Sequence, residues 1–547
     1  MLLNRFWRSK SGNFALLMGL GLPAILSAVA FATDVSTMMR AKSNLQNALD
    51  AANLASSHLG DLDITRTDAF DRYFQANIVG HGELVNAQAT LTVDKGVNFI
   101  KTKAVASADV NLNFAFLFGQ SKHIVVDASA VESNNQLEVV LVLDNTGSMA
   151  GARMTALRTA TKSLLDTLES TKSPTRQVRA SLVPFVTAVN VNGDGFDPSW
   201  IDMDGKSSTN GINFPVIDGK RPNHMALFKQ LKDTGWAESG WNGTGWKGCV
   251  EARAGAYNIS DTPPDPAKPD TLFVPYFAPD DPGDAQMPSS SYGNQAKYYN
   301  NSYLADTGDT VKLDKQKGNN RLGIDFSGLD SDPDKSTKEE VAKYVAPVKE
   351  LITETGSAIT VGPNRSCPTP VVPLTDDFDK LRKAASQMTE WNGSGTNVSE
   401  GLSWGMRVLS PGAPYTGGAP FKTPGISKIV LLLTDGENVV YGASDEQPTK
   451  SDYTSYGYLA GGRFGSDNQA TAARNVDGWT KSVCTQLKNE GVQIYTMVLQ
   501  SDTAANRTLY SACASDPSDY YAVNDPAKLP NVFQQIANKF SKLQLTN

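Results

Sequence analysis

Histidine and cysteine are scarce in this sequence. Four of each occur among 547 residues. The histidines stand in separate segments, at His58, His81, His123 and His224, so a histidine-based metal centre or catalytic triad would require distant segments to converge. The small, even number of cysteines is compatible with two disulfides if the compartment is oxidising.

The chain also has no excess of basic residues. Lysine and arginine number 50 against 57 aspartate and glutamate, and the net charge is −7 at pH 7. Proteins that bind nucleic acids generally carry a basic patch or stripe. The composition therefore gives no support for a nucleic-acid partner, while the length allows more than one domain and a sizeable core.

A long apolar run lies near the N-terminus, at residues 14–32. Its roughly 19 residues are enough to cross about 30 Å of hydrocarbon, whereas a cleaved signal peptide usually has an apolar core of ~7–15 residues. Basic residues precede the run, at Arg5, Arg8 and Lys10, and positive charge marks the cytoplasmic side of a membrane. We predict a retained single-pass anchor at residues 1–33, with its N-terminus in the cytoplasm.

The helical pattern continues beyond the apolar run. Apolar residues recur at helical steps, and neither proline nor glycine occurs between Asp34 and His58. At residues 87–131 the pattern alternates instead, which is typical of short antiparallel strands. We predict one helix over about residues 13–58 and, at residues 34–133, a small α+β module in which that helix packs on a short sheet. This layout resembles that of pilin-type subunits.

The most distinctive stretch begins with an apolar run at residues 137–143. A Val/Leu run of this length is typical of a strand buried on both faces of a parallel sheet. It ends in polar side chains at alternate positions, Asp144, Thr146 and Ser148. Open α/β sheets bind ligands at the carboxyl ends of their strands, and carboxylate and hydroxyl oxygens suit a hard cation such as Mg²⁺. We therefore expect a cation site at the end of this strand.

Two later stretches extend this pattern. A glycine-rich loop ends near Thr396 and precedes a predicted helix, and an apolar run at residues 428–434 ends at Asp435. Together with the Asp144 motif they resemble the von Willebrand factor A domain and its metal-ion-dependent adhesion site. The pattern of that family is Asp-x-Ser-x-Ser followed by a distant threonine and a distant aspartate. Thr146 replaces a serine of the pattern and keeps the hydroxyl.

The resemblance implies a doubly wound, mostly parallel α/β sheet and a site for Mg²⁺ or another divalent cation such as Mn²⁺ or Ca²⁺. It implies five metal-binding residues: Asp144, Thr146, Ser148, Thr396 and Asp435. In that family one coordination position stays open for an acidic side chain of a partner. The expected domain covers residues 134–547.

The domain carries more sequence than a doubly wound fold requires. A first insertion, at residues 193–375, is rich in proline, glycine and polar residues, but its many aromatic residues predict an ordered, loop-rich structure. A second insertion, at residues 438–467, directly follows the strand that ends at Asp435. Two roles stay open for its tyrosines, which either shape the ligand site or fold within a surface loop: Tyr441, Tyr453, Tyr456 and Tyr458.

The cysteine positions favour two local pairings. Cys249 and Cys367 both lie in the first insertion, and Cys484 and Cys513 flank the penultimate predicted strand. We predict the disulfides Cys249–Cys367 and Cys484–Cys513. Four cysteines allow three pairings, so the other two stay open.

Enzymatic activity has little support. We identify neither a Gly-x-Ser-x-Gly nucleophile elbow nor a Gly-x-x-x-x-Gly-Lys-Ser/Thr loop. A buried strand ending in aspartate also begins haloacid-dehalogenase phosphatases, but those enzymes require a second aspartate two residues later, where this chain has Thr146. We expect a protein that is not an enzyme, with a metal-dependent hydrolase as the weaker alternative.

Several stretches resemble the TadE/TadG-like family of tight-adherence (Flp) pilus-assembly proteins. They are the anchor followed by residues 45–52, and the runs at residues 246–253 and 271–280. The resemblance implies a bacterial inner-membrane protein whose bulk lies in the periplasm, on the pilus or at the cell surface. Its implied partners are TadE-like and TadF-like pseudopilins, the Flp pilin or the pilus assembly platform, and the membrane.

These features combine into one hypothesis. The protein is a membrane-anchored, metal-dependent binding or adhesion component of this pilus machinery, and it captures an acidic group on a pilus component or a surface. The alternative is a surface adhesin that acts independently of pili.

Overall fold

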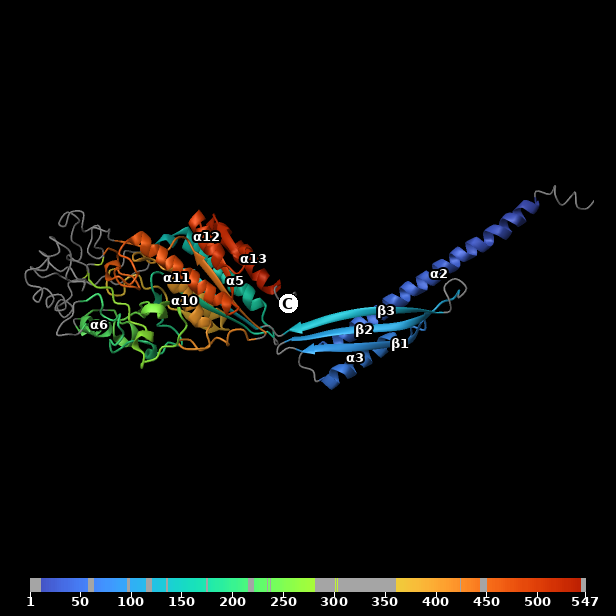
Figure 1. The fold of residues 1–547 in the computed structure, drawn as a ribbon, viewed down its shortest axis with the longest axis horizontal. Coiled ribbons are helices and arrows are strands. Elements are labelled where there is room, and N and C mark those ends of the chain that lie inside the picture. The colour runs from blue at the N-terminus through green and yellow to red at the C-terminus, as the bar shows by residue number, and fades with distance from the viewer. Residues whose placement is uncertain are drawn as a thin grey trace, which may run out of the picture. The chain divides into compact units, whose positions relative to one another are not determined.

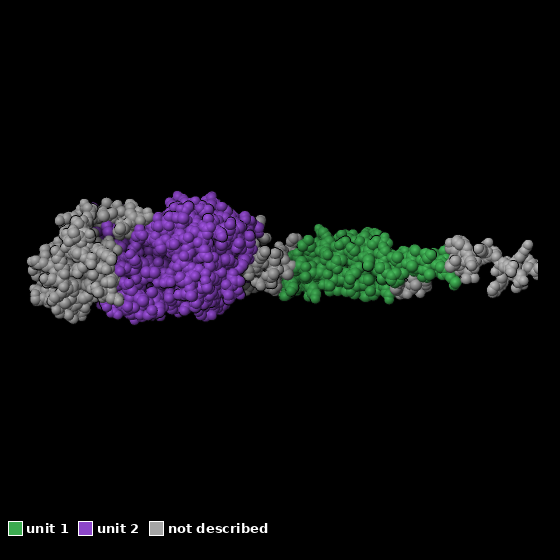
Figure 2. All heavy atoms as spheres, turned by 90° about the horizontal axis from the view of Figure 1, so that it is seen from above, with its two compact units in different colours: residues 1–135 green, residues 136–547 purple. Residues whose placement is uncertain are grey.

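The computed structural model describes residues 11–57, 63–95, 99–114, 121–133, 136–173, 176–214, 221–233, 235–236, 238–280, 301, 303, 361–423, 425–442 and 450–542. The chain divides into two compact units, residues 1–135 and residues 136–547, which are green and purple in Figure 2. The predicted boundary, between residues 133 and 134, lies two residues before this division.

The first unit is built on one long helix, α2 (Ser11–Ala55), of 45 residues. Its N-terminal half exposes large apolar side chains, including Leu20, Ile25 and Phe31. By length and composition the helix is apolar enough to cross a membrane, which is the character of either a membrane anchor or a signal sequence. The prediction of one continuous helix through the apolar run and beyond it is therefore confirmed.

The C-terminal half of α2 packs on a three-stranded antiparallel sheet (Figure 1). The other elements of the unit are α3 (Asp63–Ile78), β1 (Leu84–Lys95), β2 (Phe99–Asn111) and β3 (Ser121–Ser133). Alternation along β2 places Ala104, Ala106 and Ala108 in the same core as Leu45 and Leu49 of α2. Because alanine side chains are short, the helix lies close to the sheet. The long helix packed on a short sheet was predicted for this module, whereas the second helix, α3, was not.

The second unit contains a six-stranded mixed sheet in the order β13-β12-β10-β4-β5-β8. The strands are β4 (Gln136–Asp144), β5 (Val178–Phe185), β8 (Val372–Thr375), β10 (Ile426–Thr434), β12 (Gln493–Leu499) and β13 (Tyr520–Val523). All neighbours are parallel except β8, which runs antiparallel to β5. Numbered along the chain, the order is 6-5-4-1-2-3, that of a doubly wound sheet.

Helices cover both faces of this sheet (Figure 1). One layer contains α5 (Ala152–Ser170), α9 (Phe378–Gln387) and α13 (Leu529–Lys542), and the other contains α10 (Val398–Leu409), α11 (Gln469–Asn489) and α12 (Ala504–Cys513). Alternate residues of β4 enter the two cores, with Leu141 in the first and Val142 in the second. Burial on both faces explains why the strand is a continuous apolar run.

Two glycines let α10 approach the sheet closely. A Cβ atom on Gly401 would lie 2.7 Å from the ring of Phe185, and one on Gly405 would lie 2.8 Å from a methyl group of Val142. Larger residues at these positions would push the helix away. The glycines therefore set the position of the helix that follows Thr396.

The first insertion ends earlier than predicted. Residues 372–375 were assigned to it, but Val372–Thr375 form β8 at the edge of the main sheet. The short strand is only half apolar, so its pattern did not distinguish it from a loop. Within the described part of the insertion, Trp246, Phe273 and Phe277 are buried in the core that contains α10, which agrees with an ordered structure.

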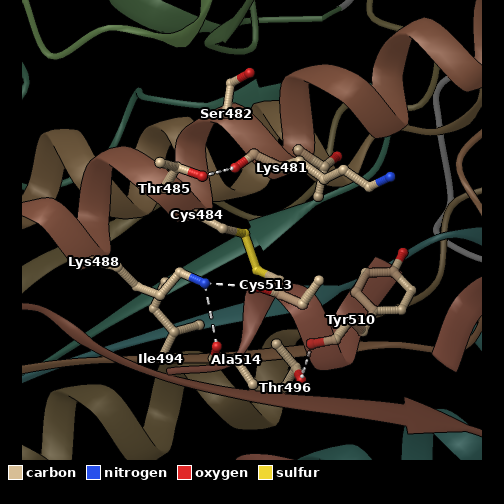
Figure 3. Close-up of a disulfide and its surroundings, with 12 residues drawn as sticks. Lys481, Ser482, Cys484, Thr485, Lys488, Ile494, Thr496, Tyr510, Cys513 and Ala514 are labelled. Atoms are coloured by element: carbon tan, nitrogen blue, oxygen red, sulfur yellow. Dashed lines mark hydrogen bonds between the residues drawn. A yellow bond between two sulfur atoms is a disulfide. The ribbon is translucent and has the colours of Figure 1, made fainter. Parts of the chain in front are cut away.

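Both disulfides have the predicted partners in the structure: Cys249 is bonded to Cys367, and Cys484 to Cys513. Figure 3 shows the second bond, which joins α11 to the C-terminal residue of α12. Beside it, the Lys488 ammonium donates hydrogen bonds to the carbonyls of Ala512 (2.7 Å) and Ala514 (3.4 Å). The bond and these contacts hold the two helices together on one face of the sheet.

Candidate metal centre

The centre begins at the end of the middle strand, β4. Asp144 is the last residue of that strand and is completely buried. Its Oδ1 accepts hydrogen bonds from the Thr146 amide (2.8 Å) and the Thr146 hydroxyl (2.6 Å). Its Oδ2 accepts one from the Thr434 hydroxyl (2.7 Å). The hydroxyls of Thr146 and Ser148 lie 3.0 Å apart. The alternate spacing of the motif therefore places its three oxygen-bearing side chains together.

Asp435 joins this group from the neighbouring strand. It directly follows β10, which is parallel to β4 with Leu433 opposite Leu143. Both strands consequently end at the same edge of the sheet. The Ser148 hydroxyl donates a hydrogen bond of 2.8 Å to Asp435 Oδ1. Residues separated by 287 positions in the chain thus meet, as the resemblance implied.

The two carboxylates of the centre repel each other when both are ionised, so a centre without a nearby cation is electrostatically unfavourable. Burial, and then the charge of Asp435, raise the pKa of Asp144 to about 7. Burial also raises the pKa of Asp435, although the hydrogen bond from Ser148 and the charge of Arg153 oppose this change. Two buried carboxyl groups that share one hydrogen-bond network favour either a proton or a cation between them.

Thr396 belongs to a loop that lies against the same motif. It stands on β9 (Gly395–Thr396), opposite Val439 of β11 (Val439–Val440). The amide of Trp391, earlier in this loop, donates to the Asn145 carbonyl (2.8 Å). A Cβ atom on Gly147 would lie 2.1 Å from Asn392 Oδ1, so the close approach of the loop requires glycine there.

In the described part of the chain, the Thr396 side chain lies outside the hydrogen-bonded network of the other four residues. Among the described residues it forms no hydrogen bond with Asp144, Thr146, Ser148 or Asp435. The structure therefore brings four of the five predicted residues into one network and places the loop of the fifth beside them.

Arg153, which the sequence pattern did not indicate, occupies the edge of the centre. It lies in the first turn of α5, and its Nη1 donates to Asp435 Oδ2 (2.7 Å) and to the Ser148 carbonyl (2.7 Å). Its Nε donates to Gln500 Oε1 (2.7 Å). The only signal in the sequence was a basic residue five positions after Ser148, which by itself is unremarkable on a helix.

The donor set fits a hard cation. In the part of the chain that the structure describes, no three His, Cys, Asp or Glu side chains form a cluster able to hold a metal ion. A cation at the centre would therefore be held by two carboxylates together with hydroxyl oxygens, and water would complete its shell. Such all-oxygen sites suit Mg²⁺, Mn²⁺ or Ca²⁺ rather than softer metals.

Residues 12–57 match a family model described as putative Flp pilus-assembly TadE/G-like. The match covers little more than helix α2. No curated protein matches the chain.

Three solved structures show weak similarity to the chain. The von Willebrand factor domain of the type V pili tip protein Mfa5 from Porphyromonas gingivalis has 11% identity and a TM-score of 0.30, over 74% of this chain and 95% of that one. The pilus adhesin RrgA from Streptococcus pneumoniae has 11% identity and a TM-score of 0.30, over 84% and 50%. The pilus adhesin SpaC from Lactobacillus rhamnosus GG has 11% identity and a TM-score of 0.28, over 83% and 34%.

This chain spans about half the length of RrgA and about a third of SpaC. Similarity at these scores carries no inference about function.

The tyrosines of the second insertion differ in their environments. Tyr441 is 56% exposed, whereas Tyr453, Tyr456 and Tyr458 are buried. Tyr453 donates a hydrogen bond to Glu251, and the Tyr456 hydroxyl accepts one from Asn258 (3.0 Å).

A role of these tyrosines in shaping the ligand site stays a prediction, but Tyr453, Tyr456 and Tyr458 attach the second insertion to the first. Sequence reasoning missed this because aromatic residues in a polar loop do not reveal which surface they pack against.

The two insertions together support the Thr396 loop. Arg365 of the first insertion forms an ion pair with Asp452 of the second, with Nη2 and Oδ2 3.1 Å apart. Asp452 Oδ2 also accepts the amide of Ser394 (3.4 Å), and the Ser366 hydroxyl donates to the Asn392 carbonyl (2.7 Å). Ser366 is adjacent to Cys367, so the first disulfide anchors the segment that holds this loop.

One apparent catalytic motif has a structural explanation. Residues 401–405 read Gly-x-Ser-x-Gly, a string that sequence reasoning overlooked, but they lie within α10 and not at a strand-to-helix turn. Ser403 is completely buried, and its hydroxyl donates to the Ser399 carbonyl (2.7 Å). A nucleophile elbow requires an exposed serine on a sharp turn, so this string does not form one.

Proposed function

We propose that this chain is a membrane-anchored, TadG-like component of a tight-adherence pilus system, and that its second unit is a von Willebrand factor A domain. The family match at residues 12–57 supports a link to Tad pilus assembly. The domain assignment is supported by the doubly wound strand order and by the position of the motif at the strand ends. In this proposal α2 anchors the protein in the inner membrane.

The domain binds its partner through a divalent cation. Asp144, Thr146, Ser148, Thr396 and Asp435 would hold Mg²⁺, Mn²⁺ or Ca²⁺. When bound, the cation supplies positive charge and an open position for an oxygen ligand. The observation that carries the proposal is the hydrogen-bonded network of Asp144, Thr146, Ser148 and Asp435 at the ends of two adjacent parallel strands.

The residues of the chain prepare this site in three ways. Burial of Asp144 keeps competing water away from its carboxylate. The hydroxyls of Thr146 and Ser148 are held by the two carboxylates, and their oxygens lie 3.0 Å apart. The insertions position the Thr396 loop through Arg365 and Asp452. The partner group that fits such a centre is a carboxylate on a pilus component, such as the Flp pilin or a TadE-like or TadF-like pseudopilin, or on a surface.

Replacement of Asp144 by asparagine tests the function. The amide has the same shape but lacks the charge, so we expect Asp144→Asn to fold, to lose Mg²⁺-dependent stabilisation and to abolish adherence or pilus assembly. Asp204→Asn, at an exposed position whose ion pair among the described residues is with Lys206, is the control.

Cell fractions and sheared pili probed for the chain would show whether it remains in the membrane. Adherence and piliation at wild-type levels in Asp144→Asn would contradict metal-dependent function. Loss of adherence with normal piliation would favour a surface adhesin that is independent of pilus assembly.

A further inference from the structure

The guanidinium of Arg153 is fixed within the candidate metal centre by three acceptors from three parts of the domain. They are the Ser148 carbonyl in the motif, Asp435 Oδ2 after β10, and Gln500 Oε1 after β12. Each distance is 2.7 Å. Arg153 is only 31% exposed at its side chain. A side chain held at both Nε and Nη1 has one defined position, unlike a mobile surface arginine.

Gln500, which supplies the third acceptor of the Arg153 guanidinium, is itself held in place. Gln500 has a φ of 60°, which is unusual for a residue with a side chain. Its amide donates to the Val523 carbonyl (2.8 Å) and so ties it to the adjacent strand. The surroundings thus maintain a backbone conformation that presents Gln500 Oε1 to Arg153.

This arrangement gives the centre an internal cation. Asp435 has two oxygens, of which Oδ1 accepts from Ser148 and Oδ2 from Arg153. A divalent cation that uses Asp435 would draw on the same carboxylate and would lie close to the guanidinium. Like charges at such short range repel one another, and the repulsion is weakly screened where the carboxylate is buried.

We propose that Arg153 competes with the divalent cation for Asp435. The inference rests on the proposed metal site and concerns its regulation. Without a divalent cation, the guanidinium balances the charge of Asp435 and keeps the strand ends together. A divalent cation must share or displace this ion pair, so Arg153 lowers metal affinity and restricts loading to conditions in which the metal or an acidic partner is abundant.

Manganese binding to the purified full-length protein in detergent tests the proposal. Free Mn²⁺ is measured by electron paramagnetic resonance during titration of the wild type, Arg153→Gln, Arg153→Lys and Arg507→Gln. Arg507 is a matched control, because it pairs with Asp502 in the same unit but lies outside the centre. We expect Arg153→Gln to bind Mn²⁺ about tenfold more tightly or better, because one positive charge is removed. Arg153→Lys and Arg507→Gln should bind with affinity close to that of the wild type.

Thermal unfolding provides a second readout. In the presence of chelator, Arg153→Gln should melt below the wild type, because Asp435 loses its counter-charge. Addition of Mn²⁺ should raise its melting temperature by more than that of the wild type. If Arg153→Gln does not fold, Gln500→Ala removes one anchor of the guanidinium and should tighten Mn²⁺ binding to a smaller extent.

The outcomes separate this inference from the function on which it rests. Wild-type protein that binds Mn²⁺, with Arg153→Gln binding equally or less tightly, would overturn the competition and leave the metal site intact. Absence of Mn²⁺ binding in both proteins would overturn the metal site and the competition together.

Discussion

His224 illustrates how the hydrogen-bond partners of a buried side chain fix its protonation state. It is completely buried, its Nδ1 lies 2.7 Å from the Pro275 carbonyl, and its Nε2 accepts the amide of Gly211 (3.2 Å). A carbonyl can only accept and an amide can only donate, so Nδ1 carries the proton and Nε2 does not. Burial lowers the pKa of His224, although the nearby Glu251 carboxylate partly opposes this.

This environment predicts a loss of stability in mild acid. The unfolded histidine takes up a proton below about pH 6.5, whereas the folded one resists it until its lower pKa is reached. The contribution of His224 to the free energy of unfolding is therefore fully present above about pH 6.5. It decreases by at most about 1.4 kcal/mol per pH unit as the pH falls towards the pKa of the folded state. Urea unfolding of the wild type and His224→Gln at several pH values measures this, and an equal pH dependence in both proteins would contradict it.

At the scale of single elements, the position of α10 matters for the centre, because the helix begins just after Thr396 and its N-cap residue is Asn397. Its Gly401 faces Phe185 with no room for a methyl group. We expect Gly401→Ala to destabilise the protein by about 1–3 kcal/mol through overpacking.

Gly478→Ala in α11 is the matched control. A Cβ atom there would meet nothing within 4 Å, and alanine favours the helix by roughly 0.5–1 kcal/mol. Chemical denaturation of both variants should therefore give changes of opposite sign. A neutral or stabilising Gly401→Ala would show that α10 can move away from the sheet without cost.

At the scale of the whole molecule, the exposed apolar half of α2 predicts membrane association. The side chains of Leu20, Leu22, Ile25 and Leu26 are exposed in the structure, and such a surface is stable in hydrocarbon rather than in water. We expect the protein to remain in the membrane pellet after alkaline carbonate extraction and to require detergent. A variant that lacks residues 1–33 should become soluble. Release of the intact chain by carbonate would contradict a retained anchor.

Much of the local structure follows from the sequence. The period of the apolar residues predicted α2, the strands of the first unit and those of the main sheet other than β8, because burial on one face or on two leaves a periodic pattern in the chain. The motif residues Asp144, Thr146 and Ser148 are close in sequence, so their proximity in space was also predictable. The local pairing of Cys484 with Cys513 is found in the structure.

Other features were not visible in the pattern. Residues 372–375 were assigned to a loop because a short edge strand needs only part of the apolar pattern of a buried one. The burial of Tyr453, Tyr456 and Tyr458 depends on an interface between two insertions. A local sequence window contains only one side of such an interface.

The sequence by itself determined the long helix α2, the apolar strands of the main sheet and the oxygen-bearing residues that end the apolar runs. Only the tertiary structure decided that Ser148 meets Asp435 and that Arg153 lies on the same carboxylate. The physical reason is that local helix and strand formation depends on interactions between residues close in the sequence. The meeting of Ser148 and Arg153 at Asp435 depends instead on the pairing and register of β4 and β10, which bring together side chains 282 to 287 residues apart.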